Sequence, residues 1–221
     1  MPLRLPPPII YLITKGATNA HTTSASEEFA SVLELVSAAV AANVSLIQIR
    51  EKHLTARVLQ ELTTESAKLT RASQTRLLVN DHADIAQAAG ADGVHLTTRS
   101  LAPAVVRSTF GPDFLIGVST HTVEELREAR DQKADLAVFG PIFATESKRS
   151  YGEPLGPAKL AEVVSDLSPF PIVAIGGLKL DNANNCFNAG AVGVAAIGLF
   201  QPGDLAETVN QLRHSFERRE R

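Results

Sequence analysis

Short apolar runs alternate with longer amphipathic segments along the chain. The apolar runs are rich in β-branched residues, as expected for strands that are buried on both faces. Between them, apolar residues recur at helical spacing, as in Phe29, Val32, Leu33 and Val36. The expected strands are 9–14, 46–50, 77–79, 93–96, 115–119, 136–139, 171–175 and 193–197, and the expected helices are 27–40, 54–69, 85–89, 103–109, 122–132, 160–167, 181–189 and 205–216.

Eight successive strand–helix units predict an α/β fold, a single closed (β/α)8 TIM barrel. Capping-box patterns, Ser24 with Glu27 and Thr122 with Glu125, are expected to open two of the helices. An open doubly wound sheet is the alternative, although no G-x-G-x-x-G follows the first strand. We expect one domain over residues 1–221, with a Pro-rich lead over 1–8 and a C-terminal helix over 206–221.

Composition and charge argue against several classes of function. The 221 residues carry a net charge of −3 and no long basic run, which argues against nucleic-acid binding. No apolar run approaches membrane-spanning length, and the Pro-rich lead lacks the apolar core of a signal peptide. The single cysteine, Cys186, allows no disulfide within the chain and suits a reducing cytoplasm; on its helix it is expected to pack. The oligomeric state is left open, a homo-oligomer included.

Polar residues gather where the expected strands end, which is where TIM barrels place their active sites. Gln48, Arg50 and Lys52 follow one another at i, i+2 and i+4, so a strand would present them on one face. An amide beside two fixed cations suits a polyanion, because Arg and Lys bind phosphate oxygens. Solvated cations at a surface strand end are the alternative for this group.

Other strand ends supply matching chemistry. Gly176-Gly177 and the Ile197-Gly198 end could admit a phosphate to backbone N–H groups, or could serve as tight turns only. Asp81 could hold Mg2+ together with substrate phosphates, or could cap a helix that starts at Ala83. Satisfied hydroxyl or histidine side chains remain the alternative for three further residues at the ends of the fourth and fifth strands: His95, Ser119 and His121.

Six stretches in order together resemble the thiamine-phosphate synthase/TenI family over about residues 9–200. They are Gln48-Ile-Arg-Glu-Lys52, Asn80-Asp81, Gly93-Val-His-Leu96, Gly117-Val-Ser-Thr-His121, Phe139-Gly-Pro-Ile-Phe-Ala-Thr-Glu-Ser-Lys148 and Ala174-Ile-Gly-Gly177. The resemblance implies a TIM barrel that handles a thiazole phosphate. The synthase joins this thiazole to an aminopyrimidine diphosphate and releases diphosphate.

The resemblance also implies a role for each matching residue. Gln48 would contact the aminopyrimidine, Asp81 would bind Mg2+, and Ser119 would lie near the pyrimidine and the diphosphate. The diphosphate would be held by Arg50, Lys52, Asn80 and Lys148. The thiazole phosphate would be held by Thr145, Ser147, Gly177 and backbone near Ile197 and Gly198. The candidate catalytic residues are Arg50, Lys52, Ser119, Lys148 and His121.

One departure keeps a second activity open. Ser100 stands where the synthase usually carries a second Mg2+-binding Asp, and the Tyr151–Gly156 stretch is more similar to TenI-type members. Some of those act as thiazole tautomerases, in which the residue matching His121 resembles a general acid/base. A non-catalytic thiazole-phosphate-binding barrel, and an aldolase with Lys52 or Lys148 as a Schiff base, are further alternatives. The diphosphate-binding residues favour the synthase.

Overall fold

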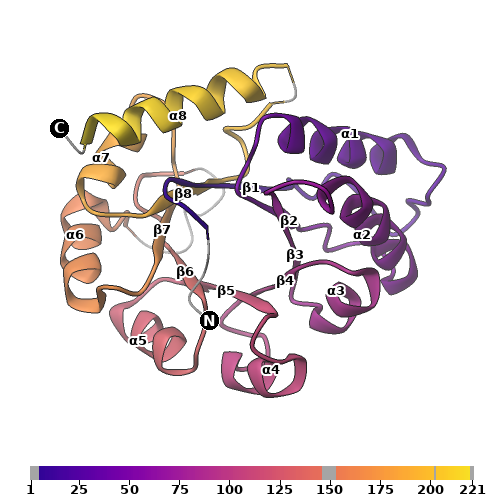
Figure 1. Cartoon of the computed structure of the whole chain (residues 1–221), viewed down its shortest axis with the longest axis horizontal. Coiled ribbons are helices and arrows are strands. Elements are labelled where there is room, and N and C mark those ends of the chain that lie inside the picture. The colour runs from indigo at the N-terminus through magenta and orange to yellow at the C-terminus, as the bar shows by residue number, and fades with distance from the viewer. Residues whose placement is uncertain (1–4, 146–152, 202, 220–221) are drawn as a thin grey trace.

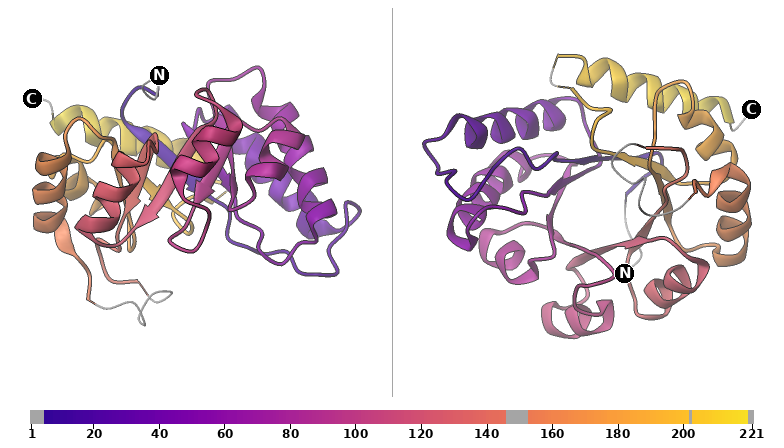
Figure 2. Two further views of the ribbon diagram at one scale, coloured as in Figure 1. Left: turned by 90° about the horizontal axis from the view of Figure 1, so that it is seen from below. Right: turned by 180° about the vertical axis from the view of Figure 1, so that it is seen from behind.

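The computed structural model describes residues 5–145, 153–201 and 203–219, which form a closed parallel barrel with helices around its outside (Figures 1 and 2). The eight strands pair in chain order and β1 closes on β8, so the predicted TIM barrel is confirmed and the open sheet is excluded. The strands are β1 (Ile9–Ile13), β2 (Leu46–Ile49), β3 (Arg76–Asn80), β4 (Gly93–Leu96), β5 (Leu115–Thr120), β6 (Leu136–Phe139), β7 (Ile172–Ile175) and β8 (Gly193–Ala196). The helices are α1 (Glu27–Ala41), α2 (Ala56–Thr70), α3 (Ala83–Ala89), α4 (Pro103–Phe110), α5 (Val123–Asp131), α6 (Gly156–Leu167), α7 (Ala183–Asn188) and α8 (Leu205–Arg219).

Strand side chains alternate between two apolar layers. In β1, Ile9, Tyr11 and Ile13 belong to a cluster made by strand residues in the barrel interior. Ile10 and Leu12 belong to the larger cluster that packs the sheet against the helices. This period of two explains why the strands are continuous apolar runs, since both faces are buried. None of the described helices could cross a membrane, being too short or too polar.

The two predicted capping boxes have different outcomes. The box of Thr122 and Glu125 at the start of α5 is confirmed in both directions. The box of Ser24 and Glu27 is wrong, because α1 begins at Glu27 and its N-cap is Ser26. The Ser26 hydroxyl instead accepts the N–H of Thr23, at 2.9 Å, within the preceding turn. Local turn bonding therefore takes the place of the expected cap.

The same pair of hydrogen bonds joins the amino-terminal ends of three pairs of neighbouring strands. The residue just before β2, β4 and β6 donates its backbone N–H to the second residue of the preceding strand and accepts that residue's N–H with its side chain. The pairs are Ser45 with Ile10, Asp92 with Leu77 and Asp135 with Ile116. Each pair adds a hydrogen bond outside the regular ladder and ties neighbouring strands at the end away from the expected site.

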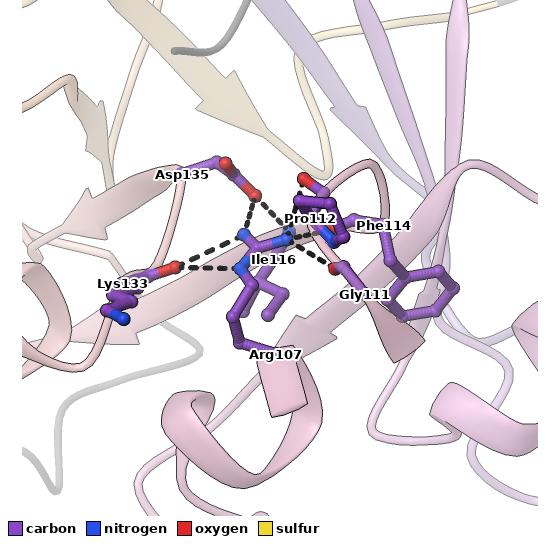
Figure 3. A network of polar contacts seen from close by, with 7 residues as sticks. All are labelled: Arg107, Gly111, Pro112, Phe114, Ile116, Lys133 and Asp135. Carbon is purple, nitrogen blue, oxygen red and sulfur yellow. Dashed lines mark hydrogen bonds and ion pairs between the residues drawn. The ribbon is translucent and has the colours of Figure 1, made fainter. Parts of the chain in front are cut away.

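Asp135 also belongs to a wider network around Arg107 (Figure 3). Its carboxylate accepts from the N–H of Ile116, at 2.7 Å, and from Arg107, at 2.6 Å. The Arg107 guanidinium also donates to backbone carbonyls, including Phe114 at 2.6 Å and Lys133 at 3.1 Å. One guanidinium on α4 therefore holds the turns before β5 and β6 in a single network.

Candidate active site

The structure places the described candidate residues on the loops and strand ends at one end of the barrel. Because all neighbouring strands are parallel, residues that follow different strands meet around a common mouth. The described candidates are Gln48, Arg50 and Lys52 at β2, Asn80 and Asp81 at β3, Ser119 and His121 at β5, Thr145 after β6, Gly177 after β7, and Ile197 and Gly198 after β8. Two others, Ser147 and Lys148, and the TenI-like Tyr151-Gly152 pair lie outside the described residues.

A line of side-chain hydrogen bonds runs from the barrel interior to its mouth. Gln48 is buried, and its Nε2 donates to Asn80 Oδ1 at 3.0 Å. Asn80 Nδ2 in turn donates to Asp81 Oδ2 at 2.8 Å. The line fixes the orientation of both amides, because each amide has its oxygen or nitrogen assigned by a partner.

The carboxylate of Asp81 is exposed and is held by neutral donors. The Ser100 hydroxyl donates to Oδ1, and Thr97 Oγ1 donates to the same oxygen at 3.3 Å. The alternative role of Asp81 as a helix cap is wrong, because His82 precedes α3 and no side chain caps the helix. Ser100, the residue that departs from the family pattern, therefore contacts the candidate metal ligand directly.

Arg50, Arg99 and Asp81 lie close enough to Lys52 for their charges to act on it. The pKa of Lys52 is lowered by its partial burial, then by the charge of Arg50 and less by that of Arg99, while the charge of Asp81 raises it. Arg99 was missed by the sequence reasoning, although it lies in the stretch that contains Ser100. The cluster concentrates positive charge beside the amide line, an arrangement suited to a phosphorylated ligand.

The expected single face of Gln48, Arg50 and Lys52 needs correction. Strand β2 ends at Ile49, so the strand alternation covers only Gln48. Arg50 is half-buried and Lys52 is exposed, in the loop beyond the strand. The two cations lie at the mouth of the barrel because they follow the strand. The alternation of side chains along β2 does not extend to them, so it does not place them on the same face as Gln48.

Glu51 is a further residue that sequence reasoning missed. Its buried carboxylate accepts from the N–H groups of Gly16 and Thr18 and from Thr18 Oγ1 at 2.7 Å. Thr14 Oγ1 accepts from the Arg50 N–H at 2.8 Å, so the loop after β1 is bound to the cationic loop after β2. The three successive charged residues at 50–52 mark Glu51 as unusual next to a buried strand. Its partners could not be found from the sequence, because they lie more than thirty residues away along the chain.

His95 and Ser119 form a second polar line. Tyr11 Oη lies 3.0 Å from His95 Nδ1, and His95 Nε2 lies 2.9 Å from Ser119 Oγ. Burial is the main cause that lowers the pKa of His95 to about 4, so its ring is neutral at neutral pH. The expectation of a satisfied core histidine is confirmed for His95. Ser119 is half-buried at the end of the line.

His121 is anchored at the start of α5. Its Nδ1 is hydrogen-bonded to the carbonyl of Gly140, and its backbone N–H donates to the Glu125 carboxylate at 2.6 Å. In the neutral ring this arrangement assigns the proton to Nδ1, because a carbonyl can only accept. The ring is thus held by the loops after β5 and β6.

The glycines after β7 and β8 differ in the space around them. Gly177 has a φ of +62°, and a Cβ there would lie 2.4 Å from the carbonyl oxygen of Ala144. A side chain at Gly177 would therefore collide with the loop after β6. A Cβ on Gly198 would meet nothing within 4 Å. The backbone at Gly177 is therefore packed against the loop after β6, whereas the space beside Gly198 is open.

The chemistry of Asp81 fits Mg2+ with help from a substrate. The described residues contain no group of three or more His, Cys, Asp or Glu side chains that could hold a metal. Asp81 offers one carboxylate, and Ser100 and Thr97 offer neutral oxygens beside it. Mg2+ is commonly bound by one or two carboxylates together with substrate phosphates, so this donor set suits an ion shared with a diphosphate.

Fold and site together define a (β/α)8 barrel with one polar mouth built from the carboxyl ends of its strands. Residues 10–200 match the family model described as thiamine monophosphate synthase. The chain therefore belongs to the thiamine monophosphate synthase family.

Individual relatives agree with this assignment. The chain is 45% identical to a putative thiamine-phosphate synthase of Geobacter sulfurreducens over 166 residues, 75% of this chain and 78% of that protein. It is 41% identical to the thiamine-phosphate synthase of Moorella thermoacetica over 182 residues, 82% of this chain and 86% of that protein. The solved thiamine phosphate pyrophosphorylase of Pyrococcus furiosus superposes with a TM-score of 0.77 at 28% identity, covering 95% of both chains.

Proposed function

We propose that this chain is a thiamine-phosphate synthase, a transferase of thiamin biosynthesis. It condenses hydroxymethylpyrimidine diphosphate with thiazole phosphate and releases diphosphate. The observation that carries the proposal is the hydrogen-bonded line Gln48–Asn80–Asp81 beside the cations Arg50 and Lys52, in a chain of this family. We place the reaction in the cytoplasm, where a lone cysteine remains reduced.

The residues act by orientation and by charge. The C–O bond to the diphosphate breaks with its electron pair leaving on oxygen, and the thiazole nitrogen then captures the methylene carbon of the resulting pyrimidine cation. Arg50, Lys52, Asn80 and Lys148 hold the diphosphate and stabilise the charge that develops on it. Gln48 holds the aminopyrimidine. No protein nucleophile is required.

Asp81 binds the Mg2+ of the diphosphate, with the Ser100 hydroxyl beside it. The ion supplies Lewis-acid stabilisation of the leaving oxygens when it is bound. Asn80 keeps the carboxylate directed, since its amide donates to Oδ2 while the hydroxyl donors occupy Oδ1.

The thiazole phosphate occupies the opposite side of the mouth. Backbone at Gly177 and near Ile197 and Gly198 contacts its phosphate, helped by the hydroxyls of Thr145 and Ser147. The open space beside Gly198 supports this placement.

The relatives named thiamine-phosphate synthase favour the transferase over the other candidates. A thiazole tautomerase would use His121 as its acid/base, an aldolase would use a lysine Schiff base, and a binding-only barrel would turn over neither substrate. None of these is needed to account for the cationic mouth.

A pair of variants tests the proposal. We expect Asp81→Asn to lower the rate of thiamine phosphate formation by roughly 100-fold. The substitution removes the carboxylate that would bind the Mg2+, and with it the ion that stabilises the leaving diphosphate. We expect His121→Asn to change that rate little, since condensation needs no proton transfer by the protein. The measurement is product formation at saturating substrates over a Mg2+ titration. An unaltered protein that forms no thiamine phosphate but tautomerises the thiazole, with that second activity lost in His121→Asn and kept in Asp81→Asn, would favour the tautomerase.

A further inference from the structure

The polar line from Tyr11 to Ser119 has a defined direction. Tyr11 is fully buried in the barrel interior, and its hydroxyl has one partner among the described hydrogen bonds, His95 Nδ1. The other ring nitrogen, Nε2, has Ser119 Oγ as its partner. Ser119 is the only member of the line that is not buried, so the line ends at the mouth of the barrel.

The protons along this line can be counted. A neutral imidazole carries one N–H, and a tyrosine hydroxyl carries one proton. With the proton on Nδ1, the Tyr11 hydroxyl proton would have no acceptor among the described residues, a costly state for a buried donor. With the proton on Nε2, Tyr11 donates to Nδ1 and His95 donates to Ser119 Oγ. Every buried donor and acceptor of the line is then satisfied.

We propose that Tyr11 and His95 are positioning residues that direct the hydroxyl proton of Ser119 toward the diphosphate of the substrate. The inference rests on the proposed function for the identity of the acceptor. Because Ser119 Oγ already accepts from His95, its own proton is free to be donated outward. The acceptor becomes more negative as the diphosphate leaves, so the bond strengthens in the transition state and should act on kcat more than on KM.

The tautomer of His95 can be measured without any turnover. Nitrogen-15 NMR of ring-labelled histidine, with His95 assigned through His95→Gln, should show the proton on Nε2 in the unaltered protein. In Tyr11→Phe the hydrogen bond that Nδ1 accepts is gone, so the Nδ1 resonance should shift toward that of an imidazole nitrogen without a donor. A proton on Nδ1 in the unaltered protein, or an Nδ1 resonance unchanged in Tyr11→Phe, would overturn the proposal.

Kinetics then separate positioning from a structural role. Ser119→Ala should lower kcat by roughly 10- to 100-fold, as expected for a hydrogen bond to a charged group, with a smaller change in KM. Tyr11→Phe should lower kcat by roughly 5-fold or more. The double variant should be no slower than Ser119→Ala, because Tyr11 acts through Ser119. Independent, multiplying effects on kcat would contradict the proposal.

A control removes a buried hydroxyl elsewhere. Thr75 donates to the Val44 carbonyl at 2.7 Å just before β3, at the opposite end of the barrel. Thr75→Val should leave kcat unchanged even where its melting temperature falls. If the unaltered protein made no thiamine phosphate, the proposed function would fail, while the NMR tautomer would still decide the direction of the line. Normal condensation with additive variants would overturn this inference alone.

Discussion

Ser100 contacts the carboxylate that the proposed reaction depends on. Its hydroxyl donates to Asp81 at the position where the resemblance leads one to expect a second Mg2+ ligand. One anionic ligand is a weak site for a hard cation, so the diphosphate must bring much of the coordination. Metal and substrate should therefore bind together.

A single substitution tests this dependence. Ser100→Asp should lower the Mg2+ concentration required for half-maximal condensation, because it adds a second anionic ligand. Ser100→Asn, which is similar in size but neutral, serves as the control and should not lower it. The measurement is initial rate against Mg2+ concentration at saturating substrates. An unchanged Mg2+ requirement in Ser100→Asp would contradict the placement of the metal.

Gly198 is the position at which the proposed thiazole-phosphate site can be tested by substitution without a steric clash. A Cβ added at Gly198 has no neighbouring atom within 4 Å. The Gly198→Asp substitution therefore introduces a negative charge at a position where a Cβ causes no steric clash. We expect thiazole-phosphate affinity to fall by roughly 10-fold or more, in line with a like charge placed beside a phosphate. Gly198→Ala should bind normally. Calorimetry that finds equal affinity for both variants would refute the site. Gly177 is less suitable, because any side chain there collides with the loop after β6.

At the scale of single residues, sequence reasoning identified types of residue but not their partners. Arg50 and Asp81 were predictable because they follow short apolar runs. Glu51, Arg99 and Tyr11 were not, since each acts through residues on a different strand or loop. Contacts of that kind depend on barrel closure, which no local pattern contains.

Among the elements, the network before β5 and β6 should matter most for stability. Arg107 and Asp135 are about 14% and 10% exposed, and the guanidinium is the counter-charge of the carboxylate. Arg107→Met should cost about 3 kcal/mol in the free energy of unfolding, because it leaves a buried carboxylate unpaired. Arg127→Met, which breaks an exposed pair with Asp166, is the control and should cost less than about 1 kcal/mol.

The loss in Arg107→Met should also depend on pH. Burial already raises the pKa of Asp135 above its usual value, against the opposing effects of the Ile116 N–H and Arg107. Without Arg107 the pKa should rise further, so the destabilisation is full above it and shrinks as the pH falls and the carboxyl is protonated. Urea unfolding at neutral and at acid pH measures this difference. An equal loss at both values would contradict the account.

Element order was predictable because its cause is local. Each strand and each helix has its own apolar period, and every expected unit is present. The ends were less accurate where the chain bonds within a turn, as Ser26 does before α1, or where a polar strand end merges with its loop, as at Arg50.

The whole molecule brings the chemistry together through closure of the barrel. The Gln48–Asn80 bond joins β2 to β3, and the line from Tyr11 to Ser119 joins β1, β4 and β5 across the barrel interior. The count of eight units predicted that closure, whereas the rotamers and tautomers that orient the site follow from packing inside the closed barrel.

The most direct test of the account is an assay of the unaltered protein for thiamine phosphate and diphosphate. Purified protein should convert hydroxymethylpyrimidine diphosphate and thiazole phosphate into both products in equal amounts, and only when Mg2+ is present. A parallel reaction with thiazole carboxylate phosphate should show no tautomerisation. Absence of condensation at saturating Mg2+, together with catalysed tautomerisation, would contradict the assignment.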